Sequence, residues 1–213
     1  MQQETRPDWR VMEVDELWAL VPPVDGRPAL VAVDGRSGSG KTTFATRLAT
    51  RPGVVLLHTD DIAWHHSFFD WHANLARHVL QPLRQGQAVA HRPQAWIDRG
   101  REGAMEVPAG ATAVVVEGVS ASHRRLDGLF DLALWVETDP REAHRRCVER
   151  DGIEELDFIA EWDAAEVPFL AADAPWRRAD LLVDGDPRLP HDPARQVVVA
   201  RPSWPQTTTP PSR

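Results

Sequence analysis

The stretch Gly35-Arg36-Ser37-Gly38-Ser39-Gly40-Lys41-Thr42 stands between an apolar run at residues 29–33 and a helix-like run at residues 42–50. It matches the pattern GxxxxGK[ST], whose glycines let backbone N–H groups converge on phosphate oxygens. The lysine of this pattern reaches the β and γ phosphates, and the hydroxyl after it can ligate the Mg²⁺ that bridges them. The stretch therefore predicts a phosphate-binding loop at the start of a helix.

We expect ATP and Mg²⁺ as the ligands of this loop. Lys41 is predicted to steady the transferred phosphoryl group, and Thr42 to ligate the metal. The predicted nucleotide-binding residues are Gly35, Arg36, Ser37, Gly38, Ser39, Gly40, Lys41, Thr42 and Thr43.

Strand-like and helix-like runs alternate along the chain around the loop. The strand-like runs are residues 29–33, 54–57, 113–117, 132–136 and 179–183. Strands separated by helices pack most simply as a parallel sheet. The alternation predicts an α/β protein with the P-loop NTPase fold, in which a five-stranded parallel sheet is flanked by helices.

The two ends of the chain and one internal segment are predicted to stay outside this sheet. Residues 8–20 have apolar side chains at helical spacing, and residues 87–108 are polar and irregular. Residues 1–186 are interpreted as a single domain, with a small lid at about residues 140–175. From residue 187 onward the composition predicts a disordered tail, and a short edge strand at residues 197–199 is the alternative.

Composition limits the partners and the compartment. The formal charge of −8 argues against nucleic-acid binding, which needs many cationic side chains. Cys147 is the only cysteine, residues 1–10 lack the apolar core of a signal peptide, and no run is long enough to span a membrane. We expect a cytoplasmic protein without a membrane partner, and the composition leaves a homo-oligomer open.

Missing motifs narrow the class of nucleotide-binding protein. Asn74 is the only asparagine, so the guanine-specifying Asn-Lys-x-Asp motif is absent, and there is no LSGGQ signature of ABC transporters. The chain is also short for a mechanical ATPase. A kinase that phosphorylates a small molecule fits these observations better than a GTPase, a transporter or a mechanical ATPase.

Two acidic residues follow the second strand-like run. Asp60 and Asp61 would lie at the carboxyl edge of the sheet, where open α/β sheets bind ligands. A carboxylate at that edge can accept the proton of an acceptor hydroxyl during phosphoryl transfer. The alternative is that either aspartate only caps a turn or a helix, and the sequence leaves open which of the two is the base.

Several motifs together resemble the uridine kinase family. They are residues 35–43 (GRSGSGKTT), residues 58–62 (HTDDI), Glu117-Gly118 and residues 145–151 (RRCVERD), and they occur in the family's order. The likeness covers roughly residues 25–186. It implies a P-loop kinase with an arginine-bearing lid.

The resemblance assigns roles by motif position. It implies that Asp60 is the catalytic base and a metal contact, that Glu117 assists the metal, and that Arg145, Arg146 and Arg150 of the lid clamp phosphates. We expect Arg145 and Arg150 to be catalytic and Arg146 to bind the nucleotide. Glu142 and Arg146, like Arg145 and Glu149, are four residues apart, so these side chains could instead form ion pairs on a solvated helix.

The acceptor region departs from the family. Uridine kinases usually carry an aromatic residue, often tyrosine, shortly after the catalytic aspartate, and this chain contains no tyrosine. Other aromatic and polar side chains are therefore the predicted acceptor-binding residues, namely Asp61, Trp64, His65, Trp96 and Arg99, with Trp71 as a further candidate.

These observations lead to one main hypothesis and two alternatives. The main hypothesis is an ATP-dependent kinase of a small-molecule hydroxyl, with a nucleoside such as uridine or cytidine as the first candidate. The first alternative is a kinase of another hydroxylated metabolite. The second is a non-catalytic ATP-binding switch in which nucleotide orders residues 87–108 for a protein partner.

Overall fold

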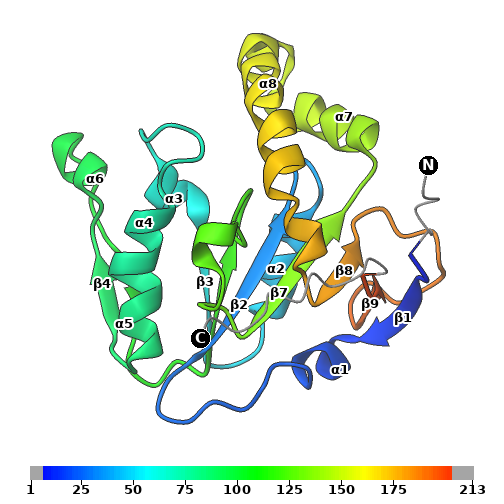
Figure 1. Ribbon diagram of the computed structural model, residues 1–213. Helices are drawn as coiled ribbons and strands as arrows, with labels where there is room; N and C mark the ends of the chain where they lie inside the picture. Colours follow the sequence, from blue (N-terminus) through cyan, green and yellow to red (C-terminus); the bar gives the residue numbers. More distant parts are fainter. Residues whose placement is uncertain (1–6, 203–213) are drawn as a thin grey trace, which may run out of the picture.

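The protein was analysed as a computed structural model, which describes residues 7–202. Within them a seven-stranded sheet has the order β1-β9-β8-β7-β2-β6-β3 (Figure 1). The parallel strands are β2 (Ala29–Gly35), β3 (Val54–His58), β6 (Ala113–Glu117), β7 (Leu132–Glu137) and β8 (Leu181–Asp184). The predicted five-stranded parallel sheet is confirmed, and two antiparallel strands extend it.

Helices cover both faces of the sheet, which explains why its central strands are apolar without alternation. Val31 and Val33 of β2 pack in one core with α2 (Lys41–Leu48). Leu30 packs on the opposite face with a continuous helical segment, which consists of α4 (His72–Leu75), the π-helical turn η1 (Ala76–Leu80) and α5 (Gln81–Arg84).

The ends of the described chain form two strands, of which the sequence offered only the second, as an alternative. β1 (Arg10–Glu13) pairs with β9 (Gln196–Ala200), and β9 also pairs with β8, both antiparallel. The helix predicted at residues 8–20 is therefore wrong over its first half, and only α1 (Val14–Trp18) is helical.

The prediction of a disordered tail is wrong for residues 196–200. Val197, Val198 and Val199 are at most 2% exposed, because β9 lies between β1 and β8 and joins the core. The alternative of a short strand at residues 197–199 is confirmed, but the strand does not lie at the edge of the sheet. Residues 203–213 of the predicted tail lie outside the described residues.

Residues 87–108 are more regular than predicted. β4 (Val89–His91) and β5 (Met105–Val107) form a separate two-stranded antiparallel sheet, with α6 (Gln94–Asp98) between them. Val89 and Val107 are buried in the core beneath this hairpin. Short apolar pairs within a polar segment were enough to anchor it.

Two long helices rise above the carboxyl ends of the parallel strands (Figure 1). α7 (Pro140–Asp151) begins at Asp139, whose carboxylate accepts from the first backbone N–H groups, and α8 (Leu156–Asp173) follows after a short turn. The remaining short helices are α3 (Thr59–Ala63), η2 (Arg124–Leu126), η3 (Ile153–Glu155) and η4 (Pro175–Arg177). No helix within residues 7–202 is long and apolar enough to cross a membrane.

Candidate active site

The phosphate-binding loop joins the end of β2 to the start of α2. Gly38 and Gly40 have φ angles of 73° and 93°, in the left-handed region that glycine adopts without strain. A Cβ atom on Gly38 would come within 2.0 Å of the carbonyl oxygen of Ala143 in α7. Glycine is therefore needed at position 38 both for the turn and for the close approach of the lid.

Thr42 and Glu117 meet at the mouth of this loop. The Thr42 Oγ1 atom lies 3.3 Å from both carboxylate oxygens of Glu117, because β6 runs beside β2 in parallel and ends at the same edge. Hydroxyl and carboxylate oxygens suit Mg²⁺, which in such sites keeps its other positions for phosphates and water. The pair therefore fits the predicted metal site.

His58 contacts the same carboxylate from the end of β3. Its Nδ1 atom lies 2.5 Å from Glu117 Oε1, and this hydrogen bond raises the pKa of His58 above its ordinary value. The contact fixes the orientation of Glu117 toward Thr42. The sequence analysis did not identify His58 as a site residue, although it directly precedes the Thr59-Asp60-Asp61 motif.

A cavity of about 250 Å³ lies between the phosphate-binding loop and the two lid helices. It brings together five of the predicted catalytic and metal-binding residues, namely Lys41, Thr42, Asp60, Glu117 and Arg150. A phosphate-binding lysine, a metal-binding pair, a carboxylate and a guanidinium around one cavity are the parts that phosphoryl transfer requires.

The two neighbouring aspartates differ in their surroundings. Asp60 lines the cavity, its backbone carbonyl accepts from the Trp64 N–H, and its carboxylate makes no hydrogen bond or ion pair within residues 7–202. Asp61 does not line it, and its carboxylate accepts a hydrogen bond from Arg101 at 2.5 Å. The geometry therefore favours Asp60 over Asp61 as the carboxylate available to an acceptor.

The lid arginines lie on different faces of α7. Arg150 lines the cavity, and its guanidinium is 2.6 Å from Asp151. Arg145 does not line the cavity: it pairs with Glu142 and Glu149 on the exposed side of the helix. The predicted clamping role of Arg145 thus has no support in this arrangement, because its ion partners lie three and four residues away on the outer face.

Arg146 lies beside a second cavity, of about 270 Å³, next to the start of α2. Its guanidinium donates to the carbonyl oxygen of Gly185 at 2.9 Å, and Gly40 and Thr43 also line this cavity. This cavity adjoins the phosphate-binding loop on the side away from Asp60. Arg146 also pairs with Glu142 and with Asp186, both at 2.8 Å, so the predicted alternative of an ion pair along the helix is present for this residue. Its role in binding the nucleotide stays a prediction.

The other loop residues contact the sheet and the lid. Ser37 lines the first cavity and its backbone N–H donates to Glu166 of α8, Ser39 is fully buried, and Arg36 lines a further cavity beside α7 and α8. Gly35 is in close contact with β7, because a Cβ atom there would come within 2.8 Å of the Val136 carbonyl oxygen. The loop is thus held by the sheet beneath it and by the lid above it.

Comparison with known proteins agrees with this geometry. A family model described as an AAA domain matches residues 30–165, which is more than half of the chain. The chain belongs to this AAA-domain family. The match includes the whole phosphate-binding loop, Asp60 and Glu117, together with α7 and the first part of α8.

Two solved structures with a similar fold are described as a putative and a possible kinase. One is described as a "putative fructose transport system kinase" from Silicibacter sp. TM1040, with a TM-score of 0.57 and 18% identity over 75% of this chain and 92% of that one. Another is a "possible uridine kinase" from Bacillus stearothermophilus, with a TM-score of 0.53 and 18% identity over 79% of this chain and 96% of that one. At these identities the likeness demonstrates a shared P-loop kinase-like fold.

The predicted acceptor-binding residues of this AAA-domain chain do not line the cavity. Trp96 is 4% exposed, and its indole N–H donates to the Asp61 carbonyl oxygen at 2.8 Å. The Arg101 guanidinium lies 3.5 Å from the Trp96 ring centre and 5.4 Å from that of Trp64. His65 and Arg99 are exposed and also lie outside the cavity lining.

The expectation that these residues surround the catalytic cavity does not agree with the structure. Trp96 and Trp64 stabilise the base of the hairpin around Arg101, which the sequence analysis missed. Trp71, the further candidate, is 1% exposed and packs in the core beneath α4. Trp64 and His65 were predicted from their closeness to Asp60 in sequence, and Trp96 and Arg99 from their residue types; neither feature shows which side chains reach the cavity.

Residues of α8 line the cavity where the predicted acceptor-binding side chains were expected. Phe158, Ile159 and Trp162 line the cavity opposite the sheet. Glu166, one turn further, is 3% exposed, and its carboxylate accepts from the Ser37 backbone N–H at 2.7 Å and from the Trp162 indole at 3.2 Å. The sequence offered only their spacing of three to four residues, which places them on one face of a helix without identifying that face.

Asp34, directly before the loop, is a further residue that the sequence analysis missed. It is fully buried, and its carboxylate accepts four hydrogen bonds, from the backbone N–H groups of Gly35, Ser120 and Ser122 and from the Ser122 hydroxyl. Burial raises the pKa of Asp34 to about 6, and the donors oppose the rise. The residue ties the phosphate-binding loop to the segment that follows Glu117.

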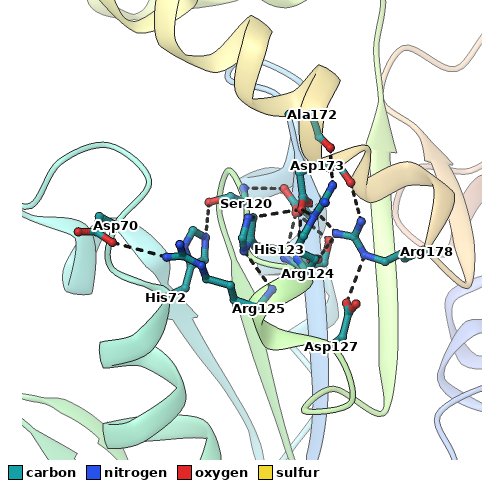
Figure 2. Close-up of polar contacts among 12 residues, drawn as sticks. Asp70, His72, Ser120, His123, Arg124, Arg125, Asp127, Ala172, Asp173 and Arg178 are labelled. Carbon is teal, nitrogen blue, oxygen red and sulfur yellow. Dashed lines mark hydrogen bonds and ion pairs between the residues drawn. The ribbon is translucent and has the colours of Figure 1, made fainter. Parts of the chain in front are cut away.

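A cluster of charged residues fixes the base of the lid (Figure 2). Asp173, at the end of α8 and 3% exposed, accepts from Arg124 at 2.7 Å and from Arg178 at 2.6 Å. His123 lies 3.4 Å from the same carboxylate, and His72 contacts Ser120 at 3.0 Å. The Ser120 segment is thus held between Asp34 and the end of α8, so the lid and the loop share one support.

Proposed function

We propose that this chain is an ATP- and Mg²⁺-dependent kinase that transfers the γ-phosphoryl group to a hydroxyl of a small-molecule acceptor. The observation that carries the proposal is the single cavity shared by Lys41, Thr42, Asp60, Glu117 and Arg150. Family membership supports nucleotide binding. The kinase activity and its acceptor are our inference.

Different residues bind the phosphates, bind the metal and accept the proton. The backbone of the phosphate-binding loop and Lys41 hold the β and γ phosphates, and Thr42 and Glu117 would hold Mg²⁺, which neutralises charge on the phosphate oxygens when bound. Asp60 orients the acceptor hydroxyl and accepts its proton as the acceptor oxygen bonds to the γ phosphorus. The bond to the β–γ bridging oxygen breaks, and ADP leaves.

Arg150 and the lid helices complete the site. A guanidinium at the cavity can stabilise charge on the transferred group, and Phe158 and Trp162 line the side of the cavity formed by the lid. A nucleoside such as uridine or cytidine remains the first candidate acceptor, and another hydroxylated metabolite is the second. The charge of −8 and the small cavity favour a small-molecule acceptor over nucleic acid. The proposed compartment is the cytoplasm.

We expect a substitution of Glu166 to change the affinity of the protein for ATP. Its buried carboxylate places a negative charge on an N–H group of the phosphate-binding loop. Glu166→Gln keeps an oxygen that can accept from Ser37 but removes the charge that opposes a triphosphate. We expect ATP to bind about three- to tenfold more tightly to this variant in calorimetry, whereas Glu161→Gln, an exposed control on the same helix, leaves the affinity unchanged. Equal or weaker binding by the Glu166 variant would mean that the contact supports the loop rather than competing with phosphate.

The proposed activity is tested by product analysis. Purified protein with Mg-ATP is supplied with nucleosides, sugars and simple alcohols, and products are identified by mass. We expect one acceptor class to gain a phosphoryl group, and Lys41→Ala to reduce this at least about 10²-fold because the phosphates lose their cation. Acceptor-independent ATP hydrolysis alone, at a rate unchanged in Lys41→Ala, would contradict the proposal and leave the nucleotide switch as the better account.

A further inference from the structure

The wall of the cavity that belongs to α8 is apolar and partly aromatic. Phe158, Ile159 and Trp162 line it, together with Val119 from the segment after β6. Phe158 is 51% exposed although it lies at the cavity, so its ring is accessible to a ligand. Exposed aromatic surface at the edge of a polar site is typical of a place where a ligand ring packs.

This aromatic wall is held in position from outside. The Phe68 ring centre lies 4.9 Å from that of Trp162 and 6.3 Å from that of Phe158, both edge to face. The Trp162 indole N–H is bonded to Glu166, which is itself bonded to the phosphate-binding loop. The two rings on α8 are therefore oriented before any ligand binds.

Within residues 7–202, the charged groups that line the cavity, apart from Asp60, are paired or are assigned to the phosphates of ATP, as Lys41 and Arg150 are. Glu117 is in contact with His58 at 2.5 Å, Asp151 with Arg150 at 2.6 Å, and Asp163 with His144 at 2.8 Å. Lys41 and the metal-binding pair serve the phosphates of ATP. Asp60 is the one cavity carboxylate without such a partner within residues 7–202, and its proposed role is to receive a hydroxyl proton.

The aromatic residues on the opposite side are not accessible in the same way. Trp96 is 4% exposed, and Arg101 lies over its ring and near that of Trp64. Within residues 7–202, the aromatic residues that line the cavity beside Asp60 are Phe158 and Trp162, and both belong to the lid.

We propose that the acceptor is an uncharged hydroxyl compound with a planar ring, and that Phe158 and Trp162 of α8 determine this specificity by packing against the ring. The inference rests on the proposed kinase function and names the substrate class of the same site. A pyrimidine nucleoside and an aryl-methyl alcohol both meet the description. A hexose does not meet the description, because its hydroxyl groups would lose water against an apolar wall. A sugar phosphate does not meet it either, because the cations that line the cavity are already assigned to the phosphates of ATP.

The test compares four acceptors at fixed Mg-ATP: uridine, benzyl alcohol, glucose and glucose 6-phosphate. Initial rates give kcat/KM for each acceptor with wild-type protein, with Phe158→Ala, and with Leu156→Ala. Leu156 is 44% exposed on the same helix and does not line the cavity, so it is the matched control. Thermal unfolding of each variant is measured alongside, and Phe158→Leu provides a second variant that keeps apolar volume but removes the ring.

We expect uridine or benzyl alcohol to exceed both sugars by at least about tenfold in kcat/KM. Phe158→Ala and Phe158→Leu should raise the KM of the ring-bearing acceptor about five- to twentyfold with little change in the KM for ATP, and Leu156→Ala should change neither. A sugar or sugar phosphate used as well as the ring-bearing compounds would overturn the inference. So would a KM that Phe158→Ala and Phe158→Leu leave unchanged in folded protein. Both results keep the kinase proposal, whereas no phosphorylated product from a broad panel would count against the kinase itself.

Discussion

Asp60→Asn is expected to lower turnover about 10²- to 10⁴-fold, while the affinity for ATP changes less than about twofold. Asp60 lines the cavity, and its carboxylate makes no ion pair or hydrogen bond within the described residues, so it is available to accept the acceptor's proton. Asparagine keeps the shape of the side chain but cannot take that proton. Steady-state rates with the best acceptor and calorimetric ATP binding together measure both quantities.

Asp61→Asn is the matched comparison for this prediction. Asp61 is bonded to Arg101 and lies outside the cavity lining, so its replacement should reduce turnover less than about tenfold. If Asp61→Asn abolishes turnover and Asp60→Asn spares it, the base is Asp61 and the hairpin side of the site moves during the reaction. The sequence alone left these two residues as alternatives, and the cavity separates them.

Asp34→Ala is expected to destabilise the protein by about 3 kcal/mol, which corresponds to a melting temperature lower by about 6–12 °C for a chain of this size. The reason is the set of four donors that the buried carboxylate accepts, since three backbone N–H groups and a hydroxyl would lose their partner. Differential scanning calorimetry at neutral pH measures the change.

Asp15→Ala serves as the control for stability. Asp15 is 95% exposed and pairs with Arg51 at 3.4 Å, so its loss should change the free energy of unfolding by less than about 0.5 kcal/mol. A melting temperature that Asp34→Ala leaves unchanged would mean that water replaces the carboxylate, and that Asp34 does not hold the Ser120 segment to the loop.

The parts of the site that lie close together in sequence could be predicted from it. The loop residues 35–42 have a fixed spacing that only one backbone arrangement uses, and the parallel strands were visible as apolar runs. Asp60 and Glu117 follow two of those strands directly, so a parallel sheet brings them to the same edge. The structure places both at the cavity with Lys41 and Thr42.

The parts of the site that depend on how a helix is rotated could not be predicted. Arg145 and Arg150 belong to one helix, yet the first faces solvent and the second the cavity. Phe158, Trp162 and Glu166 come close to the phosphate-binding loop only because α8 crosses above it. The sequence shows that these three share a helix face but not what the face contacts.

Strand β9 is a second feature that the sequence could not determine, because it depends on tertiary structure. A three-valine island within a Pro- and Arg-rich segment is a weak signal, and its burial comes from pairing with β1, at the other end of the chain. The order of strands in a sheet decides such cases, and that order is a tertiary property.

The fate of the γ-phosphoryl group tests the central claim most directly. The protein is given ATP labelled at the γ phosphate, Mg²⁺ and the acceptor panel, and the label is traced in acceptor and in inorganic phosphate. The account predicts that label appears in an acceptor faster than ATP is hydrolysed without acceptor, and that Asp60→Asn slows this transfer about 10²- to 10⁴-fold. Label found only in inorganic phosphate, at a rate independent of every acceptor, would contradict the assignment of a kinase.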